Sequence, residues 1–483
     1  MNIFIKDRKE AEFPCEALIL PFTENERDIY TGLPASLSGV IKRVFVREFR
    51  GKKNQTLLIP SPEGLKPERI FFVGLGSKNE LSPEAVRLAG GRSGVVLRDA
   101  SIKRAALSVQ CLSSHHLSPI AFTEGILLGT YRFQKYHHER SITAIESVTI
   151  LSRSSQELRA VLRWTEALSA SVNFARDLIN TPANDMTPTH LADSALSLKD
   201  RNLSVTVLDR GNAARRGMGA YLSVAHGSHQ PPKFIVLEYR GSKAKPIVII
   251  GKSITFDSGG LSLKPAEGME KMKYDMAGGA AVLGVLRALS ARQIPVHVIG
   301  MLPATENLPG GAASRPGDVV RAINGKTIEI ISTDAEGRMT LADAIGFAAQ
   351  YKPRAIIDIA TLTGACAIAF GNCAIAMMGN DRELLNAIKK ASEKSGERVW
   401  EMPLLDECRE YLKSDIADMK NSGGKGGSLL SSAYFLSEFA AKIPWVHLDI
   451  AGTAWADKER PYYPKGATGI GVRLIATLLK EWS

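Results

Sequence analysis

Two stretches of this 483-residue sequence carry side chains whose types and spacing suit metal chemistry. One is Ser332-Thr333-Asp334-Ala335-Glu336-Gly337-Arg338, in which two carboxylates stand two residues apart and an arginine follows. Carboxylates at positions i and i+2 of a strand point to the same side, so both could hold one cation. Taken alone, the stretch is more typical of a strand-to-helix loop with an acidic residue near the helix start, where the helix dipole favours negative charge.

The second stretch, Gly251–Pro265, lies upstream and strengthens the case for metal binding. The polar residues that it and the following segment contribute are Lys252, Asp257, Lys264 and Asp275. With Asp334 and Glu336 the two aspartates make four carboxylates, a charge of about −4 that is unfavourable at close range without cations. Two divalent ions would cancel this charge, so a two-metal site is a physically reasonable solution.

The other polar residues narrow the kind of site. All nine histidines lie outside these stretches, which excludes the HExxH type of zinc site. Lys252 leaves two interpretations open: a structural ion-pair partner, or a neutral amine ligand, because a nearby dication disfavours the ammonium form. Lys264 and Arg338 are cations suited to polarising a carbonyl or holding an anion.

Strand ends must bring these residues together. From about residue 200 the sequence alternates between apolar strand patterns and helical patterns, which predicts a large central sheet with helices on both faces. The strands are predicted near residues 203–208, 234–238, 246–250, 295–301, 326–331, 355–360, 373–378 and 446–450. Because open α/β sheets bind ligands at the carboxyl ends of their strands, we expect 246–250 and 326–331 to deliver both stretches to one edge.

The first 150 residues predict a separate compact α/β domain, in which we find no catalytic motif. Its strands are predicted at 3–5, 17–21, 56–59, 70–73, 106–109 and 148–151, and its helices at 36–47, 82–96 and 120–134. A long helical pattern follows, and Thr187-Pro188 is typical of a further helix start. We therefore expect a smaller N-terminal α/β domain (1–153), a connecting helix (154–179) and a larger C-terminal α/β catalytic domain (180–483) with a central mixed sheet.

Composition points to a cytoplasmic protein. A charged content of 23% is ordinary for a soluble globular chain. Five cysteines without CxxC spacing indicate free thiols in a reducing compartment. The N-terminus has no signal-peptide pattern. The apolar segment 355–378 is interrupted by Asp358, Gly364, Gly371 and Asn372, so we predict two buried parallel strands joined by a turn and no membrane span.

The net charge of +11 is spread along the chain, with one local basic run. That run consists of Lys42, Arg43, Arg47, Arg50, Lys52 and Lys53. A solvated helix face with its following loop is the favoured interpretation. A nucleic-acid-binding patch is the alternative.

The blocks that carry these residues resemble those of the leucyl (cytosol) aminopeptidase family, the M17 metallopeptidases. STDAEGR stands where the family has NTDAEGR, Gly251–Pro265 matches its GK-x-x-TFDSGG-x-x-x-KP block, and Lys273–Met276 matches its KYDM. Further matching blocks are 303–307, 315–318, 358–365, 447–455 and 466–469. The resemblance covers the chain from about residue 180 onward, whereas the first 150 residues match only in size and character.

The resemblance implies two divalent metal ions, zinc or manganese, with magnesium able to replace one. Asp257 and Glu336 would bridge the ions, Asp334 would complete the readily exchanged site, and Lys252 with Asp275 would complete the tighter one. A hydroxide bridging the metals would attack the first peptide carbonyl of a substrate with a free N-terminus. Only the N-terminal residue would be removed, because the substrate amine binds one metal.

The resemblance also implies a catalytic pair and a substrate pocket. Lys264 would stabilise the oxyanion together with the metals, and Arg338 would hold a bicarbonate ion that acts as general base. The carbonyl of Leu362 would contact the substrate amine. The pocket for the first side chain would be lined by small or apolar residues that suit Leu-like side chains, namely Met272, Thr361, Gly364, Ala451 and Ala454.

The sequence departs from the family pattern at a few positions. Ser332 replaces the usual Asn, Ser253 the usual Gly, and 310–314 a run that is usually SGNAY-like. None of these changes removes an expected ligand, although Ser332 could alter the support of Asp334. Family members form hexamers, so we expect a homohexamer. Two further functional classes stay open: an additional DNA-binding role, and a catalytically weakened scaffold, against which the complete set of seven polar residues argues.

Overall fold

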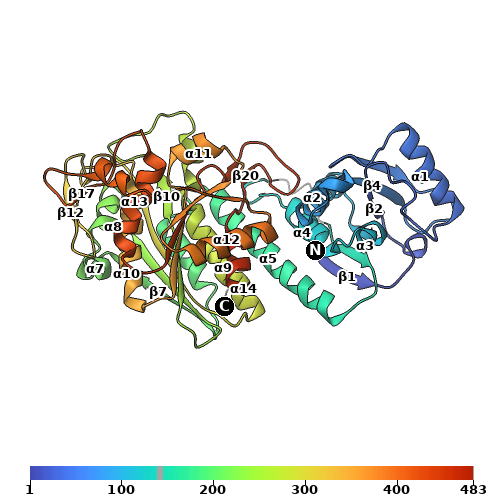
Figure 1. Ribbon diagram of the computed structural model, residues 1–483, viewed down its shortest axis with the longest axis horizontal. Helices are drawn as coiled ribbons and strands as arrows, with labels where there is room; N and C mark the ends of the chain where they lie inside the picture. Colours follow the sequence, from blue (N-terminus) through green and yellow to red (C-terminus); the bar gives the residue numbers. More distant parts are fainter. Residues whose placement is uncertain (139–144, 482–483) are drawn as a thin grey trace. The chain divides into compact units, whose positions relative to one another are not determined.

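The computed structural model describes residues 1–138 and 145–481, and these residues form two compact units. The first unit comprises Met1–Ala170 together with Asp457–Lys465, and the second comprises Ser171–Ala456 together with Gly466–Ser483. Each unit has its own sheet and its own helices (Figure 1). The α/β fold class expected from the sequence is confirmed.

The first unit is built on a sheet that contains six strands in the described residues, in the order β1-β6-β5-β2-β4-β3. The strands are β1 (Asn2–Lys6), β2 (Ala17–Thr23), β3 (Thr56–Pro60), β4 (Arg69–Gly76), β5 (Arg104–Ser108) and β6 (Ser147–Leu151). All neighbours run parallel except β3, which is antiparallel to β4. Every strand predicted in this part of the chain is present.

Helices cover both faces of this sheet. They are α1 (Ala35–Arg47), α2 (Pro83–Asp99), α3 (Gln110–Ser114) and α4 (Pro119–Gly129). Figure 1 shows α1 on one side of the sheet and α2 with α4 on the other. The helix predicted for 120–134 ends at Gly129, earlier than expected. The six residues of the basic run on α1 and the loop after it are all exposed, as a solvated face requires.

The helix expected to connect the domains is present as α5 (Gln156–Asn180). The next helix, α6 (Pro188–Leu196), begins where Thr187-Pro188 predicted a start. The Thr187 hydroxyl caps it by accepting a hydrogen bond from the His190 backbone N–H at 3.3 Å. Proline suits the first helical position because its missing N–H would have no partner there.

The second unit is built on a mixed sheet that comprises nine strands in the described residues, in the order β16-β15-β18-β14-β9-β11-β8-β7, with β10 added on β11. The strands are β7 (Leu203–Leu208), β8 (Lys233–Arg240), β9 (Ile247–Gly251), β10 (Ser253–Asp257), β11 (His297–Asn307), β14 (Ala355–Ala360), β15 (Ile375–Gly379), β16 (Val399–Glu401) and β18 (Trp445–Asp449). At its centre β10, β11, β9, β14 and β18 all run in one direction. Their carboxyl ends therefore share one edge.

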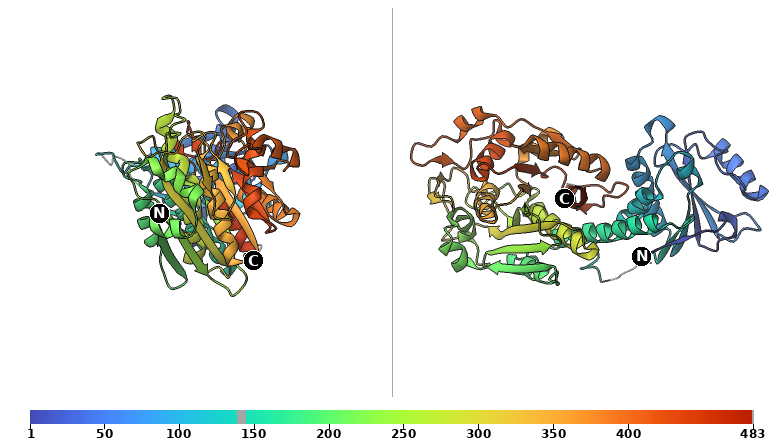
Figure 2. Two further views of the ribbon diagram at one scale, coloured as in Figure 1. Left: turned by 90° about the vertical axis from the view of Figure 1, so that its left-hand side faces the viewer. Right: turned by 60° about the horizontal axis from the view of Figure 1, so that its bottom comes forward.

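Two helical layers bury this sheet. The helices that follow α6 are α7 (Arg210–Arg215), α8 (Gly219–Val224), α9 (Ala277–Arg292), α10 (Glu336–Ala348), α11 (Gly364–Phe370), α12 (Arg382–Ser395), α13 (Ser428–Ala440) and α14 (Val472–Glu481). Figure 1 shows α8, α10 and α13 on one face and α9, α12 and α14 on the other. The core beneath α8, α10 and α13 includes Tyr221, Leu341 and Phe435. The strands, coloured green to orange, run side by side in Figure 2.

Two expectations for this unit were wrong. The strand predicted at 326–331 is only β13 (Thr327–Glu329), and it pairs outside the main sheet with β12 (Val319–Arg321) and β17 (Met419–Lys420). The segment 355–378 is not two parallel strands joined by a turn, because helix α11 separates β14 from β15 and β15 runs antiparallel to β18. Apolar runs predict burial, but they do not identify the strand with which each run pairs.

No helix in the described residues is long and apolar enough to cross a membrane. All five cysteines lie within described segments and none forms a disulfide; Cys373 is the exposed one.

A last pair of short strands, β19 (Trp455–Ala456) and β20 (Gly466–Ala467), flanks the segment that belongs to the first unit.

Candidate active site

The carboxyl edge of the parallel strands carries most of the residues that the sequence singled out. Lys252 lies directly after β9, and Asp257 is the last residue of β10. β9 pairs with the first part of β11, and β10 pairs with a later part of the same strand from Ser253 onward. Lys252 lies between these two pairings, where the hydrogen-bond ladder is interrupted. This break directs the lysine side chain into the protein, where it is 3% exposed.

The acidic pair Asp334 and Glu336 reaches the same place by a route that the sequence did not predict. Asp334 lies in the loop after β13, and Glu336 is the first residue of α10. The two carboxylates therefore do not share one strand face, and their strand does not belong to the main sheet. Instead, the loop and the first turn of a helix that packs on β9, β11 and β14 place them over the sheet edge.

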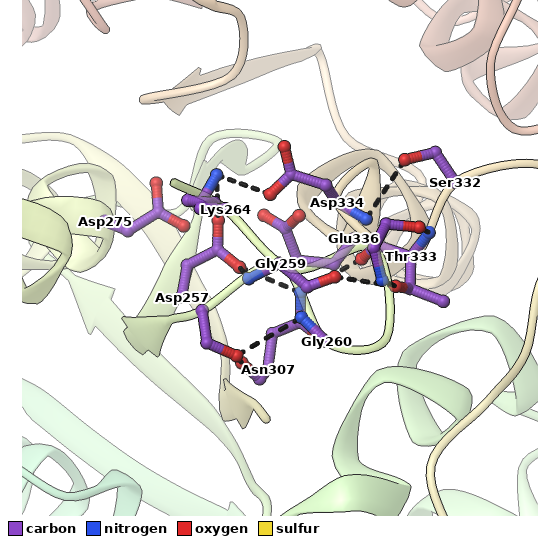
Figure 3. A network of polar contacts seen from close by, with 12 residues as sticks. Asp257, Gly259, Gly260, Lys264, Asp275, Asn307, Ser332, Thr333, Asp334 and Glu336 are labelled. Carbon is purple, nitrogen blue, oxygen red and sulfur yellow. Dashed lines mark hydrogen bonds and ion pairs between the residues drawn. The ribbon is translucent and has the colours of Figure 1, made fainter. Parts of the chain in front are cut away.

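Three carboxylates converge at the centre of the site. Asp257, Asp334 and Glu336 each offer an oxygen, and these oxygens lie within 4.8 Å of one another. Figure 3 shows the three side chains pointing toward a common centre. Glu336 Oε2 is buried and has no hydrogen-bond partner in the described part of the chain. Clustered oxygen donors with an unused buried lone pair fit a divalent cation.

Lys252 and Asp275 lie beside this cluster. Lys252 Nζ is 2.8 Å from Asp275 Oδ2, 2.8 Å from Glu336 Oε1 and 2.9 Å from the Thr361 carbonyl oxygen. Burial disfavours the ammonium form, but the facing carboxylates outweigh it and raise the pKa of Lys252 above its ordinary value. Burial also raises the pKa of Asp275, against the attraction of Lys252. Of the two interpretations left open for Lys252, ion-pair partner or neutral amine ligand, the structure shows the ion pair.

Lys264 bridges two of the converging carboxylates. Its Nζ lies 2.8 Å from Asp257 Oδ2 and 2.5 Å from Asp334 Oδ1, and its side chain is 22% exposed (Figure 3). Burial opposes its charge, yet Asp257 and the neighbouring acids raise the pKa of Lys264 above its ordinary value. Lys264 is therefore a cation placed on the accessible side of the cluster.

The charge balance of the site differs from the one argued from the sequence. Four carboxylates bring −4, but Lys252, Lys264 and Arg338 bring +3, which leaves −1 if all are ionised. Charge alone therefore does not require two divalent ions, because the chain supplies most of the compensating charge itself. The support for a cation comes from the convergence of oxygens around Glu336.

Arg338 lies in the first turn of α10 and is buried. Its Nη1 donates a 2.8 Å hydrogen bond to the Asn421 carbonyl oxygen, and its Nε has no partner among the described residues. Burial lowers the pKa of Arg338 to about 10, so the guanidinium keeps its charge at neutral pH. A buried cationic donor without a partner fits a bound anion.

Several residues that the sequence analysis did not single out brace the carboxylates. Asn307, the last residue of β11, donates from Nδ2 to Asp257 Oδ1 at 2.8 Å and to the Thr333 carbonyl oxygen at 3.0 Å. Thr333 Oγ1 donates to the Gly259 carbonyl oxygen at 2.6 Å (Figure 3). These bonds tie the loop after β10 to the loop after β13. In the sequence, Asn307 was marked only as the last residue of the family-matching block 303–307.

The residues expected to line the substrate pocket lie on three segments at the same edge. Thr361, Leu362 and Gly364 follow β14, Ala451 and Ala454 follow β18, and Met272 lies in the short 3₁₀ helix 269–276. Asp449 links two of these segments, because its Oδ1 accepts from the backbone N–H groups of Leu362 at 3.2 Å and Ala451 at 3.0 Å. Asp449 is buried, and the sequence analysis did not identify it.

A small cavity of about 20 Å³ adjoins the acidic loop. Ser332, Thr333, Glu336, Asn307 and Asn421 contribute to its lining. In the described part of the chain, none of the expected substrate-binding residues lines it. Val224, Leu308 and Met339 also line it, so its lining is mixed, and its volume is about that of one water molecule. It is therefore part of the support behind the carboxylates and not a substrate pocket.

Together the fold and the site define an α/β enzyme whose polar residues gather at the carboxyl edge of its central sheet. Two family profiles match the sequence: the catalytic domain of the cytosol aminopeptidase family (Peptidase_M17) over residues 173–476 and the N-terminal domain of that family over residues 19–140. The chain belongs to the cytosol aminopeptidase family, which confirms the resemblance seen in the sequence. It is a peptidase with aminopeptidase activity.

Relatives match nearly the whole chain. A probable cytosol aminopeptidase of Geotalea uraniireducens is 47% identical, covering 94% of this chain and 93% of the relative. One of Geobacter sulfurreducens is 45% identical, covering 99% of both chains. Among solved structures, a mutant of tomato leucine aminopeptidase is 32% identical, covers 100% of this chain and 96% of its own, and has a TM-score of 0.90. The bottromycin maturation enzyme BotP, solved in complex with Mn, is 31% identical, covers 97% and 99%, and has a TM-score of 0.87.

Proposed function

We propose that this chain is a metal-dependent aminopeptidase that removes Leu-like N-terminal residues from peptides. The observation that carries the proposal is the convergence of Asp257, Asp334 and Glu336 within 4.8 Å, in a chain that belongs to the cytosol aminopeptidase family. The structure of BotP with Mn is a relative's precedent for a divalent ion in this fold.

Two divalent ions, zinc or manganese, would be held by the carboxylates and by Lys252. Asp257 and Glu336 would serve both ions, Asp334 the exchangeable ion, and Asp275 with Lys252 the tighter ion; the convergence of the first three and the contacts of Lys252 with Asp275 and Glu336 support this assignment. When bound, such ions supply Lewis-acid polarisation of a carbonyl and an activated water. Lys252 would serve as a ligand only in its neutral form, since its ammonium is the partner of Asp275 and Glu336 in this structure.

Lys264 and Arg338 would stabilise the negative charges that the reaction involves besides those held by the ions. The Lys264 ammonium is partly exposed above the carboxylates, where it can donate to the carbonyl oxygen of the first peptide bond as negative charge develops on it. The unpartnered Nε of Arg338 would hold a bicarbonate ion, placed to accept the proton that the attacking water loses. Burial keeps this arginine in a fixed orientation.

The segments after β14 and β18 would select the substrate. The Leu362 carbonyl would accept a hydrogen bond from the free amine, which requires an unblocked N-terminus. The small or apolar side chains of Met272, Thr361, Ala451 and Ala454, together with Gly364, would leave room for a Leu-like residue. A homohexamer in the cytoplasm is part of the same proposal, and the five free thiols support a reducing compartment.

Hydrolysis of a leucine anilide in the presence of Mn²⁺ or Zn²⁺ tests this function. We expect activity that a chelator abolishes and that Lys264→Ala lowers by about 100-fold or more, as expected for the loss of one oxyanion donor. Lys326→Ala is the matched control, because Lys326 forms an ion pair with Glu438 away from the carboxylate cluster. Its activity should equal that of the wild type.

A folded wild-type protein that is loaded with metal and hydrolyses no aminoacyl substrate would refute the proposal. Equal activities of Lys264→Ala and Lys326→Ala would remove Lys264 from the mechanism. The first of these results would favour the scaffold alternative.

A further inference from the structure

Asn421 connects the acidic loop to the rest of the second unit. It follows β17 directly, and it is 1% exposed. Its side-chain Oδ1 accepts hydrogen bonds from the backbone N–H groups of Ile331 at 2.8 Å and Ser332 at 3.3 Å. Its Nδ2 donates to the Ser332 carbonyl oxygen at 2.7 Å. One amide side chain therefore binds three backbone groups of the loop that leads to Asp334.

The main chain of Asn421 makes two further bonds in the same region. Its N–H donates to the Glu329 carbonyl oxygen at 2.9 Å, which extends the pairing of β13 with β17. Its carbonyl oxygen accepts the 2.8 Å bond from Arg338 Nη1. The residue thus contacts both the loop before the carboxylates and the buried guanidinium after them.

These contacts continue the connection between the two segments beyond the end of the β13–β17 strand pairing. The β13–β17 ladder stops at Glu329 and Lys420, so the backbone groups of Ile331 and Ser332 have no strand beside them. A side-chain amide carries both a donor and an acceptor, so Asn421 can bond to N–H and C=O groups of these two residues at once. The Ser332 hydroxyl accepts a 3.3 Å bond from the Asp334 N–H, and the Ser332 carbonyl oxygen accepts one from the Ala335 N–H at 3.2 Å.

We propose that Asn421 is the positioning residue that fixes Asp334 and Arg338 relative to each other. The inference rests on the proposed function and deepens it. Without this amide Ile331 and Ser332 lose three hydrogen bonds, while Thr333 keeps its bonds to Asn307 and Gly259. The start of the loop is then released, and Asp334 shifts relative to Asp257 and Glu336. The ion to which Asp334 contributes is therefore held less tightly, whereas the ion held by Lys252 and Asp275 keeps its ligands, because Asn421 contacts neither.

The test compares Asn421→Ala and Asn421→Ser with a matched control, Asn380→Ala. Asn380 has the same chemistry elsewhere in the unit: its Oδ1 accepts from the Trp445 N–H at 2.7 Å and its Nδ2 donates to the Ile443 carbonyl oxygen at 3.0 Å. Asn421→Ser keeps a small polar side chain and serves if the alanine variant does not fold. Each full-length protein is loaded with Mn²⁺ and dialysed against graded chelator, and its metal content, thermal unfolding and leucine anilide kinetics are measured.

We expect the Asn421 variants to lose one of two ions about 10- to 100-fold more readily than the wild type, the range found when a residue supporting a metal ligand is removed. The second ion should be retained as in the wild type, and kcat should fall when metal is limiting. Asn380→Ala should keep both ions at wild-type affinity.

Three results would overturn the inference. Asn421 variants that retain both ions as the wild type does, or that lose both in parallel with a lowered unfolding temperature, would leave Asn421 a general structural residue. Wild-type protein that binds no ion and cleaves no substrate would remove the proposed function and the inference with it. Wild-type activity with unaltered Asn421 variants removes the inference alone.

Discussion

The ammonium group of Lys252 lies among three oxygens, from Asp275, Glu336 and the Thr361 carbonyl. Its side chain reaches them past the first turn of α10, at Gly337. A Cβ on Gly337 would lie 2.7 Å from Lys252 Nζ and 2.6 Å from its Cε. The glycine is therefore required by the close approach of the lysine, and not by an unusual backbone angle.

Gly337→Ala should displace the Lys252 ammonium from Asp275 and Glu336. Because the lysine is buried and held by three partners, it cannot move aside without losing bonds. We expect leucine anilide hydrolysis to fall by about 10-fold or more, with the metal affinity of the tighter site reduced by a similar factor.

Gly346→Ala is the control for this prediction, since it lies on the same helix and its Cβ would meet only the Ile323 side chain, at 2.5 Å from Cγ2. Alanine gains about 1 kcal/mol of helix propensity over glycine in both variants. Equal activity in the two variants would show that the clash with Lys252 has no functional effect.

The carboxylates that converge at the site were easier to predict than the residues that brace them. Asp257, Asp334 and Glu336 stand in short stretches whose spacing suggested metal chemistry, and the structure brings them together. Asn307, Asn421 and Asp449 support the site from positions far apart in the sequence. Their bonds go to side-chain or backbone groups of other segments, so no local pattern in the sequence reveals them.

Helix α10 supplies Glu336 and Arg338 from its first turn, and further along the same helix Asp343 anchors it. Asp343 is fully buried, and its two oxygens accept hydrogen bonds from the Tyr221 N–H and the Ile323 N–H, each at 2.8 Å. The carboxylate thereby fixes α10 against α8 and against the segment after β12. The position of the acidic loop depends on this attachment.

Asp343→Ala should destabilise the protein by about 2–4 kcal/mol, because two buried N–H groups lose their acceptor. Asp381→Ala is the contrast: Asp381 is half-exposed and caps α12 with one 2.8 Å bond from the Leu384 N–H, so its loss should cost about 1 kcal/mol. Urea unfolding of both variants measures the difference. A cost for Asp343→Ala no larger than that for Asp381→Ala would contradict this account of how α10 is anchored.

At the level of elements, strand and helix positions could be predicted from apolar patterns, but pairing could not. The apolar run at 326–331 predicted a strand, and β13 is there, yet it pairs with β12 and β17 and not with the central sheet. The acidic pair still reaches the sheet edge, because α10 packs on β9, β11 and β14. Which strand becomes a neighbour depends on contacts between distant segments.

At the scale of the molecule, the segment Asp457–Lys465 belongs to the first unit although it lies between two parts of the second. Within that unit the Tyr462 hydroxyl donates to Glu84 Oε1 at 2.5 Å, and Arg98 Nη2 lies 3.1 Å from Glu459 Oε1. The domain boundaries predicted from the sequence, 1–153 and 180–483, place this segment in the C-terminal domain because they follow the order of the chain. Its attachment depends on long-range contacts that sequence patterns do not report.

The proposed homohexamer makes a simple prediction about mass. Six copies of the 52.3 kDa chain give about 314 kDa, which light scattering behind size exclusion would measure directly. The mass should stay constant over a tenfold dilution. A stable species of 52.3 kDa across that range would contradict the hexamer without affecting the proposed chemistry of the site.

The central claim is that Asp257, Asp334 and Glu336 hold divalent ions without which the peptidase is inactive. Titrating Mn²⁺ into chelator-stripped enzyme, while following leucine anilide hydrolysis and bound metal on the same samples, tests it most directly. We expect no hydrolysis in the stripped enzyme and activity that saturates as two ions bind per chain. Full activity in stripped enzyme that retains well under one ion per chain would contradict it.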